Sequence, residues 1–303
     1  MSIVFHNDPF TPFDRQETPL NDSPGFVPGH RRSIAIPSDL FPTAVEAVRL
    51  RVGARPLDVA QWVSPVDDDW SHTIAMKRAL IAERPQEVIA CVEGAEEACE
   101  EVAAGVLASI GANPSMESGI DALVDAALQV ADDVCILLPD DNGMPRLSAA
   151  VLCSPNRWRL ADKIGGTMAS IHSPVARYDT DLNSPVNSVM MRLSPERPIW
   201  RANWGISNHP ALFQPDTPPI TPEMNAADMW FRVEWQTLRR LPLTGGILFT
   251  IRTYVEKLSD FMERDQPLVQ DIAELVNKIH EDVAQYKSIA PYREKLFAYF
   301  ETR

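Results

Sequence analysis

The chain has 303 residues, with 28 Lys and Arg against 42 Asp and Glu, so its formal net charge at pH 7 is −14. A chain this acidic repels phosphate groups, which argues against binding to nucleic acid and against docking on anionic membranes. Hydrophobic residues make up 45% and charged residues 23%, a globular balance that excludes wholesale disorder.

The sequence shows no targeting or covalent-attachment signal. Its start lacks the basic residues and apolar run of a signal peptide, and no stretch of about 18 apolar residues occurs. We therefore expect a cytoplasmic protein without membrane contact. No Cys-X-X-Cys-His site is present, so a bound heme would be held non-covalently. The cysteines are Cys91, Cys99, Cys135 and Cys153.

The first third of the chain is predicted to be helical after a proline-rich start. Residues 1–42 contain seven prolines and are expected to form an N-terminal arm, extended over the body or partly disordered. Apolar residues then recur at helical spacing in four segments, residues 43–54, 69–81, 93–110 and 120–130.

The rest of the chain alternates between strand and helix patterns. Helices are expected again over residues 267–286 and 292–300. Helices, then strands, then helices predict an α+β fold with an antiparallel sheet, in which residues 43–303 form one domain. The predicted strands are a hairpin of residues 134–138 and 147–153, a strand at 199–206, and a hairpin of 229–238 and 246–254.

The common redox and nucleotide-binding motifs are missing from the sequence. No G-x-G-x-x-G follows a predicted strand, and no Walker loop, H-E-x-x-H motif or closely spaced cysteine set for an iron–sulfur cluster occurs. If the protein performs redox chemistry, its electrons must therefore come from another chain.

Among the six histidines, His172 has the most restricted setting. It is followed by Ser-Pro-Val, and Pro174 limits the backbone beside it. The others lie in the proline-rich arm, beside acidic residues or in a loop. A lone histidine is more often structural than a metal ligand, so composition leaves both roles open for His172.

The predicted strand at residues 230–237 and the strand after it carry polar side chains on one face each. These side chains either face solvent or line a polar cavity in which an arginine pairs with a carboxylate-bearing cofactor. They are Arg232, Glu234 and Gln236 on the first strand, and Thr250, Arg252 and Tyr254 on the second.

Seven motifs occur in the order found in a known family. They are Cys-Ser-Pro-Asn-Arg-Trp at 153–158, Lys-Ile-Gly at 163–165, Ile-His-Ser-Pro-Val at 171–175 with Tyr178, Arg-Ala-Asn-Trp at 201–204, Arg-Val-Glu-Trp-Gln-Thr-Leu-Arg-Arg-Leu-Pro at 232–242, Leu-Phe-Thr-Ile-Arg-Thr-Tyr at 248–254, and Tyr286-Lys287. Over residues 130–290 the chain resembles the heme-dependent oxidative N-demethylase family. It departs from the family pattern at Ala176, Trp235 and Ser288, where the family usually has proline, arginine and glycine.

The resemblance implies a PAS-like antiparallel sheet with flanking helices that binds heme b non-covalently. It also implies a monooxygenase that removes a methyl group from a small secondary amine such as dimethylamine, using O2 and releasing formaldehyde. NADPH, a flavin and an iron–sulfur cluster on a partner reductase would supply the electrons. This division of labour agrees with the nucleotide and iron–sulfur motifs missing from this chain.

The resemblance also guides the choice of site residues. His172 is the expected metal ligand and Cys153 its rival, because imidazole and thiolate both ligate heme iron. Glu234 and Tyr178 are expected to contact the protonated amine and help take its proton, because a buried ammonium group needs a partner. Glu234 can instead be a structural partner of a neighbouring arginine. Heme propionates need cationic partners, and the candidates are Arg201, Arg232, Arg239, Arg240 and Arg252.

Two other functions fit the same residues. A heme-binding PAS-like sensor or gas-binding module would bind the cofactor without turnover, but such sensors usually carry an output domain, and no such module is recognisable in this sequence. A family member that has lost heme would serve as an interaction scaffold. A visible absorption spectrum separates that scaffold from the two heme-binding functions.

Overall fold

One antiparallel sheet organises the described part of this computed structural model, which comprises residues 3–4, 33–42, 52–264 and 266–302. Its eight strands pair in the order β1-β3-β5-β4-β8-β7-β6-β2. The α+β class is therefore confirmed, as are both predicted hairpins, β4–β5 and β7–β8. The strands are β1 (Ile3–Val4), β2 (Arg55–Pro56), β3 (Ile89–Val92), β4 (Asp133–Pro139), β5 (Pro145–Val151), β6 (Ile199–Ser207), β7 (Trp230–Arg240) and β8 (Ile247–Lys257).

The longer helices form where apolar residues recur at helical spacing, and α1, α3, α4 and α11 match four of the predicted segments. Among the described residues, none of the helices combines the length and apolar character needed to cross a membrane. The α-helices are α1 (Trp70–Glu83), α2 (Pro85–Val88), α3 (Glu96–Ser109), α4 (Gly119–Ala127), α5 (Leu160–Lys163), α6 (Met168–Ile171), α7 (Asn183–Arg192), α8 (Leu258–Phe261), α9 (Gln266–Lys278), α10 (Glu281–Tyr286) and α11 (Arg293–Phe300).

The segment 267–286, predicted as one helix, is two helices. α9 and α10 are separated at His280, whose backbone is extended, with φ −57° and ψ 143°. The Nδ1 atom of His280 accepts a hydrogen bond from the backbone N–H of Asp282 at 3.3 Å and so caps α10. Ile279 and Val283 on either side are both buried, so the apolar spacing alone does not reveal the break.

Part of the proline-rich arm packs against the end of β8. The Ile34 N–H donates to the carbonyl oxygen of Val255 at 3.2 Å, and the Ile36 N–H donates to Glu256 Oε2 at 3.0 Å. The helix predicted over residues 43–54 falls largely on residues 43–51, which lie outside the described part.

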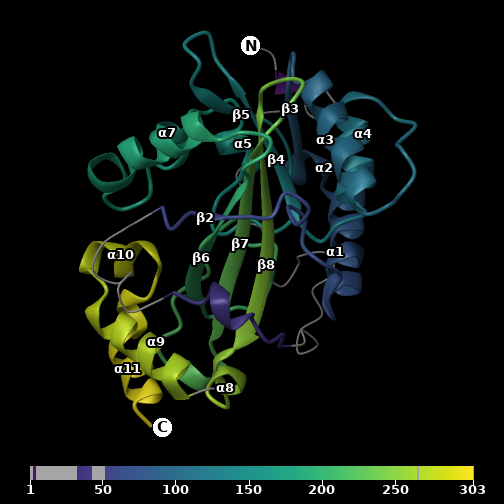
Figure 1. The fold of residues 1–303 in the computed structure, drawn as a ribbon. Helices are drawn as coiled ribbons and strands as arrows, with labels where there is room; N and C mark the ends of the chain where they lie inside the picture. Colours follow the sequence, from purple (N-terminus) through teal and green to yellow (C-terminus); the bar gives the residue numbers. More distant parts are fainter. Residues whose placement is uncertain (1–2, 5–32, 43–51, 265, 303) are drawn as a thin grey trace.

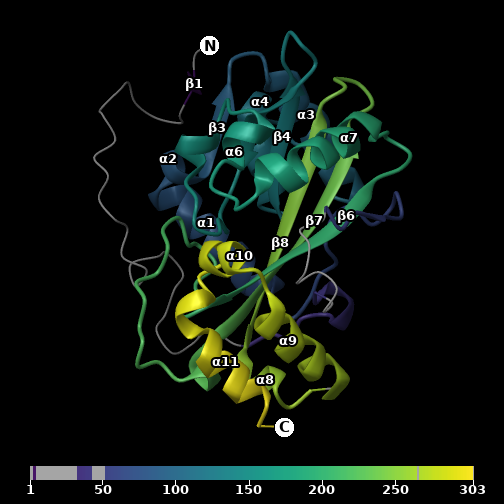
Figure 2. The same cartoon turned by 90° about the vertical axis from the view of Figure 1, so that its left-hand side faces the viewer.

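The sheet separates two groups of helices (Figure 1). α1, α3 and α4 lie on one side, beside β3, β4 and β5, and α7, α9, α10 and α11 lie on the other. Figure 2 shows α6 and α7 over one end of the long strands β6, β7 and β8, with α10 nearer the middle of these strands. Helices α6, α7 and α10, which are far apart in the sequence, thus lie over the same strands, β6, β7 and β8.

Candidate functional site

The register of β6, β7 and β8 decides which side chains share a face. Paired residues of antiparallel strands point the same way, and the two faces alternate along each strand. One face, called here the Glu234 face, therefore carries four successive rows. They are Ile199 with Leu238 and Phe249, Arg201 with Gln236 and Ile251, Asn203 with Glu234 and Thr253, and Gly205 with Arg232 and Val255.

Helices α6 and α7 cover the first row of the Glu234 face. Met168 of α6 and Met190 of α7 pack in one buried cluster with Leu238 of β7. His172 is the residue at which α6 ends. Arg201, in the second row, is one of the two cations whose charge, after burial, lowers the pKa of His172.

The imidazole of His172 is fixed by a hydrogen bond inside its own turn. The backbone N–H and the ring Nδ1 atom of His172 lie 3.1 and 2.8 Å from the carbonyl oxygen of Met168. A carbonyl oxygen can only accept, so Nδ1 carries the proton and Nε2 keeps its lone pair, the tautomer that binds a metal. Burial lowers the pKa of His172, as do the nearby charges of Arg201 and Lys163, which favours the neutral form.

The turn before α6 fixes the position of this histidine. Lys163 Nζ donates to the carbonyl oxygen of Ile171, the residue before His172, at 2.6 Å. Gly166 has no side chain at a point where a Cβ atom would lie 2.8 Å from the carbonyl oxygen of Lys163 and 2.9 Å from Ser170 Oγ. This close packing sets where α6 lies, and with it His172.

Tyr178 returns to the His172 ring through two consecutive turns. The Val175 N–H donates to the carbonyl oxygen of His172 at 2.8 Å, and the Tyr178 N–H donates to that of Val175 at 3.1 Å. The two rings stack, with centroids 4.9 Å apart. Tyr178 is 3% exposed, and its Oη has no hydrogen-bond partner among the described residues. A buried hydroxyl without a partner costs about 1–3 kcal/mol, so Oη is a candidate contact for a bound group.

Glu234 is a buried carboxylate held by neutral amides. Its Oε2 atom accepts hydrogen bonds from Asn203 Nδ2 at 3.2 Å and from Gln236 Nε2 at 2.8 Å, and the residue is 6% exposed. In the described part of the chain, no Arg, Lys or His side chain lies within ion-pair distance of this carboxylate. Buried charges are normally paired, so a carboxylate without an ion-pair partner in the described part of the chain is a candidate contact for a bound cation.

The C-terminal end of α10 also reaches the Glu234 face. Lys287 Nζ donates to Asn203 Oδ1 at 3.3 Å and to the carbonyl oxygen of Trp204, and it lies 4.7 Å from the centroid of the Trp204 ring. Tyr286 is 43% exposed as a residue, but its phenol group is largely enclosed, and this desolvation, followed by the negative charge of Glu234, raises its pKa.

Two of the departures from the family pattern can be placed in this geometry. Ser288 has a φ of 54°, a backbone region that favours glycine. Its Oγ accepts a hydrogen bond from Arg157 Nη1 at 2.8 Å, which offsets part of that cost. Trp235 lies on the face opposite Glu234, because faces alternate along β7.

Arg232 and Arg240, two of the arginines predicted to bind heme propionates, lie on the Glu234 face and donate to backbone carbonyls. Arg232 is 2% exposed and joins two loops, whereas Arg240 anchors the end of α7. The acceptors of Arg232 are the carbonyls of Ser154, Pro155, Ala211 and Leu212, and those of Arg240 are the carbonyls of Met190, Leu193 and Gly245.

Arg252 and Arg239 lie on the opposite face. Arg252 pairs in register with Trp235, so it points away from Glu234. Its Nη2 donates to both carboxylate oxygens of Asp67, at 2.9 and 2.8 Å. Arg239 lies over the Trp62 ring, 5.5 Å from its centroid. Of the five predicted arginines, Arg201 is the one whose charge, after burial, contributes to the lowered pKa of His172.

Cys153, the rival ligand, lies in the core around β3, β4 and β5. It is 0% exposed, and its backbone N–H donates to Asp133 Oδ1 at 2.9 Å. Burial, and then the charge of Asp133, raise the pKa of the Cys153 thiol. The thiolate, which is the form that ligates iron, is therefore disfavoured.

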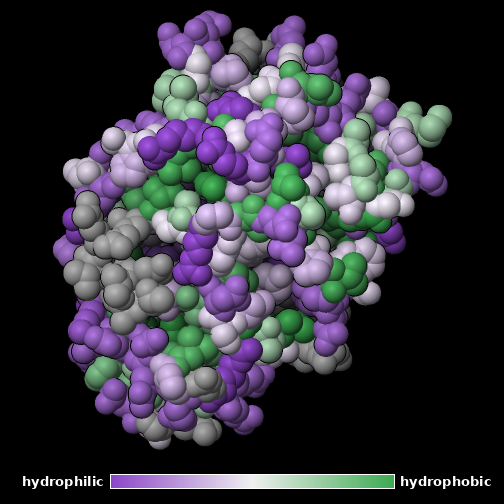
Figure 3. Space-filling model, in the orientation of Figure 1, coloured by the Kyte–Doolittle hydropathy of each residue, from purple (hydrophilic) through white to green (hydrophobic). Residues whose placement is uncertain are grey.

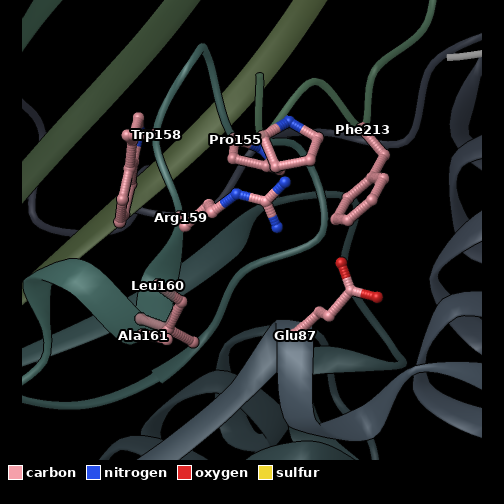
Figure 4. A pocket seen from close by; sticks show the side chains of 8 residues that line it. Glu87, Pro155, Trp158, Arg159, Leu160, Ala161 and Phe213 are labelled. Carbon is pink, nitrogen blue, oxygen red and sulfur yellow. The ribbon is translucent and has the colours of Figure 1, made fainter. Parts of the chain in front are cut away.

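The pocket in Figure 4 is a separate feature beside the motif at 153–158. Trp158, Arg159 and Phe213 are among its lining residues, and it has room for about one water molecule, so it cannot hold a heme. Figure 3 shows hydrophobic surface beside α7, on the side of the molecule that carries α6, α7 and α10.

Sequence reasoning assigned no role to Asn203 or Lys287. Asn203 follows Arg201 by two residues on β6, so both point to one face, which is the same kind of signal that singled out Glu234 on β7. Lys287 occurred only as part of the Tyr286-Lys287 motif. Its contact with Asn203 depends on the fold, which brings the end of α10 to β6.

Comparison with known protein families finds a family model whose match covers the candidate site residues. Residues 109–297 match the family model described as haem-dependent oxidative N-demethylase, alpha subunit-like. The matched segment is more than half of the chain and contains His172, Tyr178, Arg201, Glu234 and Lys287.

Proposed function

The chain belongs to the haem-dependent oxidative N-demethylase, alpha subunit-like family, and on this premise we propose that it demethylates a small secondary amine such as dimethylamine. The proposal depends on the environment of Glu234. This buried carboxylate accepts hydrogen bonds from two neutral amides and forms no ion pair with a described residue. Small secondary amines are strong bases and arrive as ammonium ions. A buried carboxylate on the face that leads to His172 is a receptor for such an ion.

The residues present fit a non-covalently bound heme b. His172 would hold the iron through Nε2, because its Nδ1 is bound to the carbonyl oxygen of Met168. Arg201 would pair with a propionate, since a guanidinium matches the geometry of a carboxylate. When bound, heme would supply the activation of O2 and the oxidation of the N-methyl group.

The side chains around it would bind and orient the amine. Glu234 Oε1 would accept a hydrogen bond from the ammonium N–H. Burial raises the pKa of Tyr178, so its hydroxyl stays protonated and can donate to a bound group. Removal of the methyl group would release formaldehyde and the demethylated amine.

We propose that electrons reach this chain from a partner reductase that carries a flavin and an iron–sulfur cluster and oxidises NADPH. This chain contains no motif for any of those groups. A heme-binding sensor or gas-binding module without turnover is the alternative function. Such a module needs no ammonium receptor, so the environment of Glu234 favours the enzyme.

The test is Glu234→Gln, with heme content, melting temperature and amine-induced spectral change measured together. We expect the variant to keep its heme and its melting temperature while amine affinity falls by at least tenfold, or about 1.4 kcal/mol. Unchanged amine affinity with a lowered melting temperature would assign Glu234 to the scaffold.

Glu256→Gln is the matched control. Glu256 is also a buried carboxylate, 2% exposed, but its oxygens are engaged by Arg264 at 3.5 Å and by the Ile36 N–H. This variant should lower the melting temperature and leave amine affinity unchanged, because its carboxylate supports the arm rather than a ligand.

A further inference from the structure

In the described part of the chain, Arg201 and Lys287 are each connected to Glu234 by a neutral side-chain amide that lies between them. On β6, Arg201 Nη1 donates to Gln236 Oε1 at 3.2 Å, and Gln236 Nε2 in turn donates to Glu234 Oε2 at 2.8 Å. The end of α10 provides a second chain of contacts with the same order. Lys287 Nζ donates to Asn203 Oδ1 at 3.3 Å, and Asn203 Nδ2 donates to Glu234 Oε2 at 3.2 Å.

In each chain of contacts, the charged groups at the two ends fix the orientation of the amide between them. If the Asn203 amide were flipped, its NH2 group would face the ammonium of Lys287 and its carbonyl oxygen would face the carboxylate of Glu234. Both contacts would be repulsive, because a cation has no acceptor and a carboxylate has no donor. The same reasoning applies to Gln236 between Arg201 and Glu234. Each cation therefore holds an amide with its donor toward the carboxylate.

This arrangement differs from a direct ion pair in its effect on Glu234. A lysine or arginine in contact with the carboxylate would neutralise it and occupy its oxygens. Here the two amides bind Oε2, and Oε1 accepts no hydrogen bond from the described residues. The carboxyl group is thus oriented through Oε2, and Oε1 is left for a ligand.

Lys287 is itself well held for this task. It donates to the carbonyl oxygen of Trp204 and lies over the Trp204 ring at 4.7 Å, so its ammonium stays beside Asn203 rather than moving to Glu234. The neighbouring Ser288 is bound by Arg157 at 2.8 Å, which fixes the backbone that carries Lys287.

We propose that Asn203 and Gln236, oriented by Lys287 and Arg201, are the positioning residues that keep Glu234 a receptor for ammonium ions and make the site select protonated amines over neutral molecules of the same shape. The inference rests on the proposed function for the identity of the ligand. The contacts between the amides and the carboxylate are independent of it.

The first experiment compares a cation with its neutral isostere. Binding of dimethylammonium and of dimethyl ether is measured by ligand-observed NMR for the wild type, Asn203→Leu, Lys287→Met and the double variant. We expect each single variant to weaken dimethylammonium binding about tenfold, and the double variant also about tenfold, because both changes interrupt one chain of contacts. Binding of the ether should stay unchanged, and Lys287→Arg should restore most of the loss in Lys287→Met.

Lys278→Met is the matched control, since it removes an exposed lysine of α9 that pairs with Glu274. It should leave both ligands unaffected. Additive losses in the double variant, or equal losses for the ether, would overturn the proposal.

The second experiment needs no ligand. The side-chain amide signals of Asn203 and Gln236, assigned with Asn203→Leu, report hydrogen bonding to a carboxylate by a downfield proton shift. We expect Lys287→Met to move the Asn203 signal upfield and to leave the Gln236 signal in place. An unmoved Asn203 signal overturns the inference. If Glu234→Gln leaves amine binding unchanged, Glu234 is not the receptor for the amine, and these amide signals alone then decide whether the chain of contacts exists.

Discussion

The rings of His172 and Tyr178 stack with centroids 4.9 Å apart and planes 8° from parallel. The contact is built locally, because two successive turns bring the chain back over the end of α6 within six residues. Together with the bond from Nδ1 to the carbonyl oxygen of Met168, the stack fixes the rotation of the imidazole. Tyr178 thus combines a ring that stacks on His172 with a buried hydroxyl group that has no partner among the described residues.

Tyr178 variants should separate these two roles. Tyr178→Phe keeps the stacked ring and removes the buried Oη, so we expect an unchanged heme spectrum and weaker amine binding. Tyr178→Leu removes the stack as well and should lower heme affinity about tenfold, since aromatic pairs contribute about 0.5–1.5 kcal/mol beyond burial. Heme titration and amine titration of both variants check this. Equal heme affinity in the two variants would show that the stack does not support His172.

Arg201 and Arg252 should respond in opposite ways to replacement by Met. Arg252 is 0% exposed and bound to Asp67, so Arg252→Met should lower the free energy of unfolding by about 3–5 kcal/mol. The fraction that folds should bind heme normally. Arg201→Met should instead lower heme affinity with a smaller change in stability. Urea denaturation and heme titration of each variant distinguish the two, and a heme defect confined to Arg252→Met would reverse the assignment.

The buried Asp133 should give stability a characteristic pH dependence. Burial raises its pKa to about 6, from an ordinary value of 3.8 for an aspartate. Between these values the folded state binds more protons than the unfolded state, so lowering the pH from 6 toward 4 adds stability, by linkage about 3 kcal/mol at most. Asp133→Asn abolishes this titration. The advantage of the wild type over this variant in urea denaturation should therefore grow as the pH falls.

Asp140→Asn is the control for this titration. Hydrogen bonds from the Met144 N–H and from Arg146 lower the pKa of Asp140, so its contribution has the opposite sign and is lost as the pH falls. A wild-type advantage over Asp133→Asn that stays constant from pH 7 to pH 4 would refute the buried titration.

The long strands were predictable because their pattern is strong. β7 alternates polar and apolar residues over the six positions Phe231–Gln236, which marks both the strand and its two faces. β3 escaped prediction because its four residues, Ile89–Val92, are all buried and show no alternation. The break at His280 escaped because the apolar stripe continues across it.

The sequence pointed to individual residues of the candidate site but not to the contacts between them. Alternation identified the face of Glu234, and the setting of His172 beside Pro174 singled out the histidine. Whether Arg252 shares the face of Glu234 depends on strand register, and a shift of one residue reverses the face. The observed register pairs Arg252 with Trp235. The contact between Lys287 and Asn203 joins distant segments, so only the fold reveals it.

Heme titration of His172→Ala, followed at the Soret band, tests the central claim most directly, with Cys153→Ala as the comparison. We predict that the wild type binds heme saturably, that His172→Ala loses the band or shifts it, and that Cys153→Ala keeps the wild-type spectrum. Added imidazole should restore the band of His172→Ala, because it replaces the missing ligand. A wild-type spectrum in His172→Ala together with loss of the band in Cys153→Ala would contradict the assignment of His172 as the heme ligand.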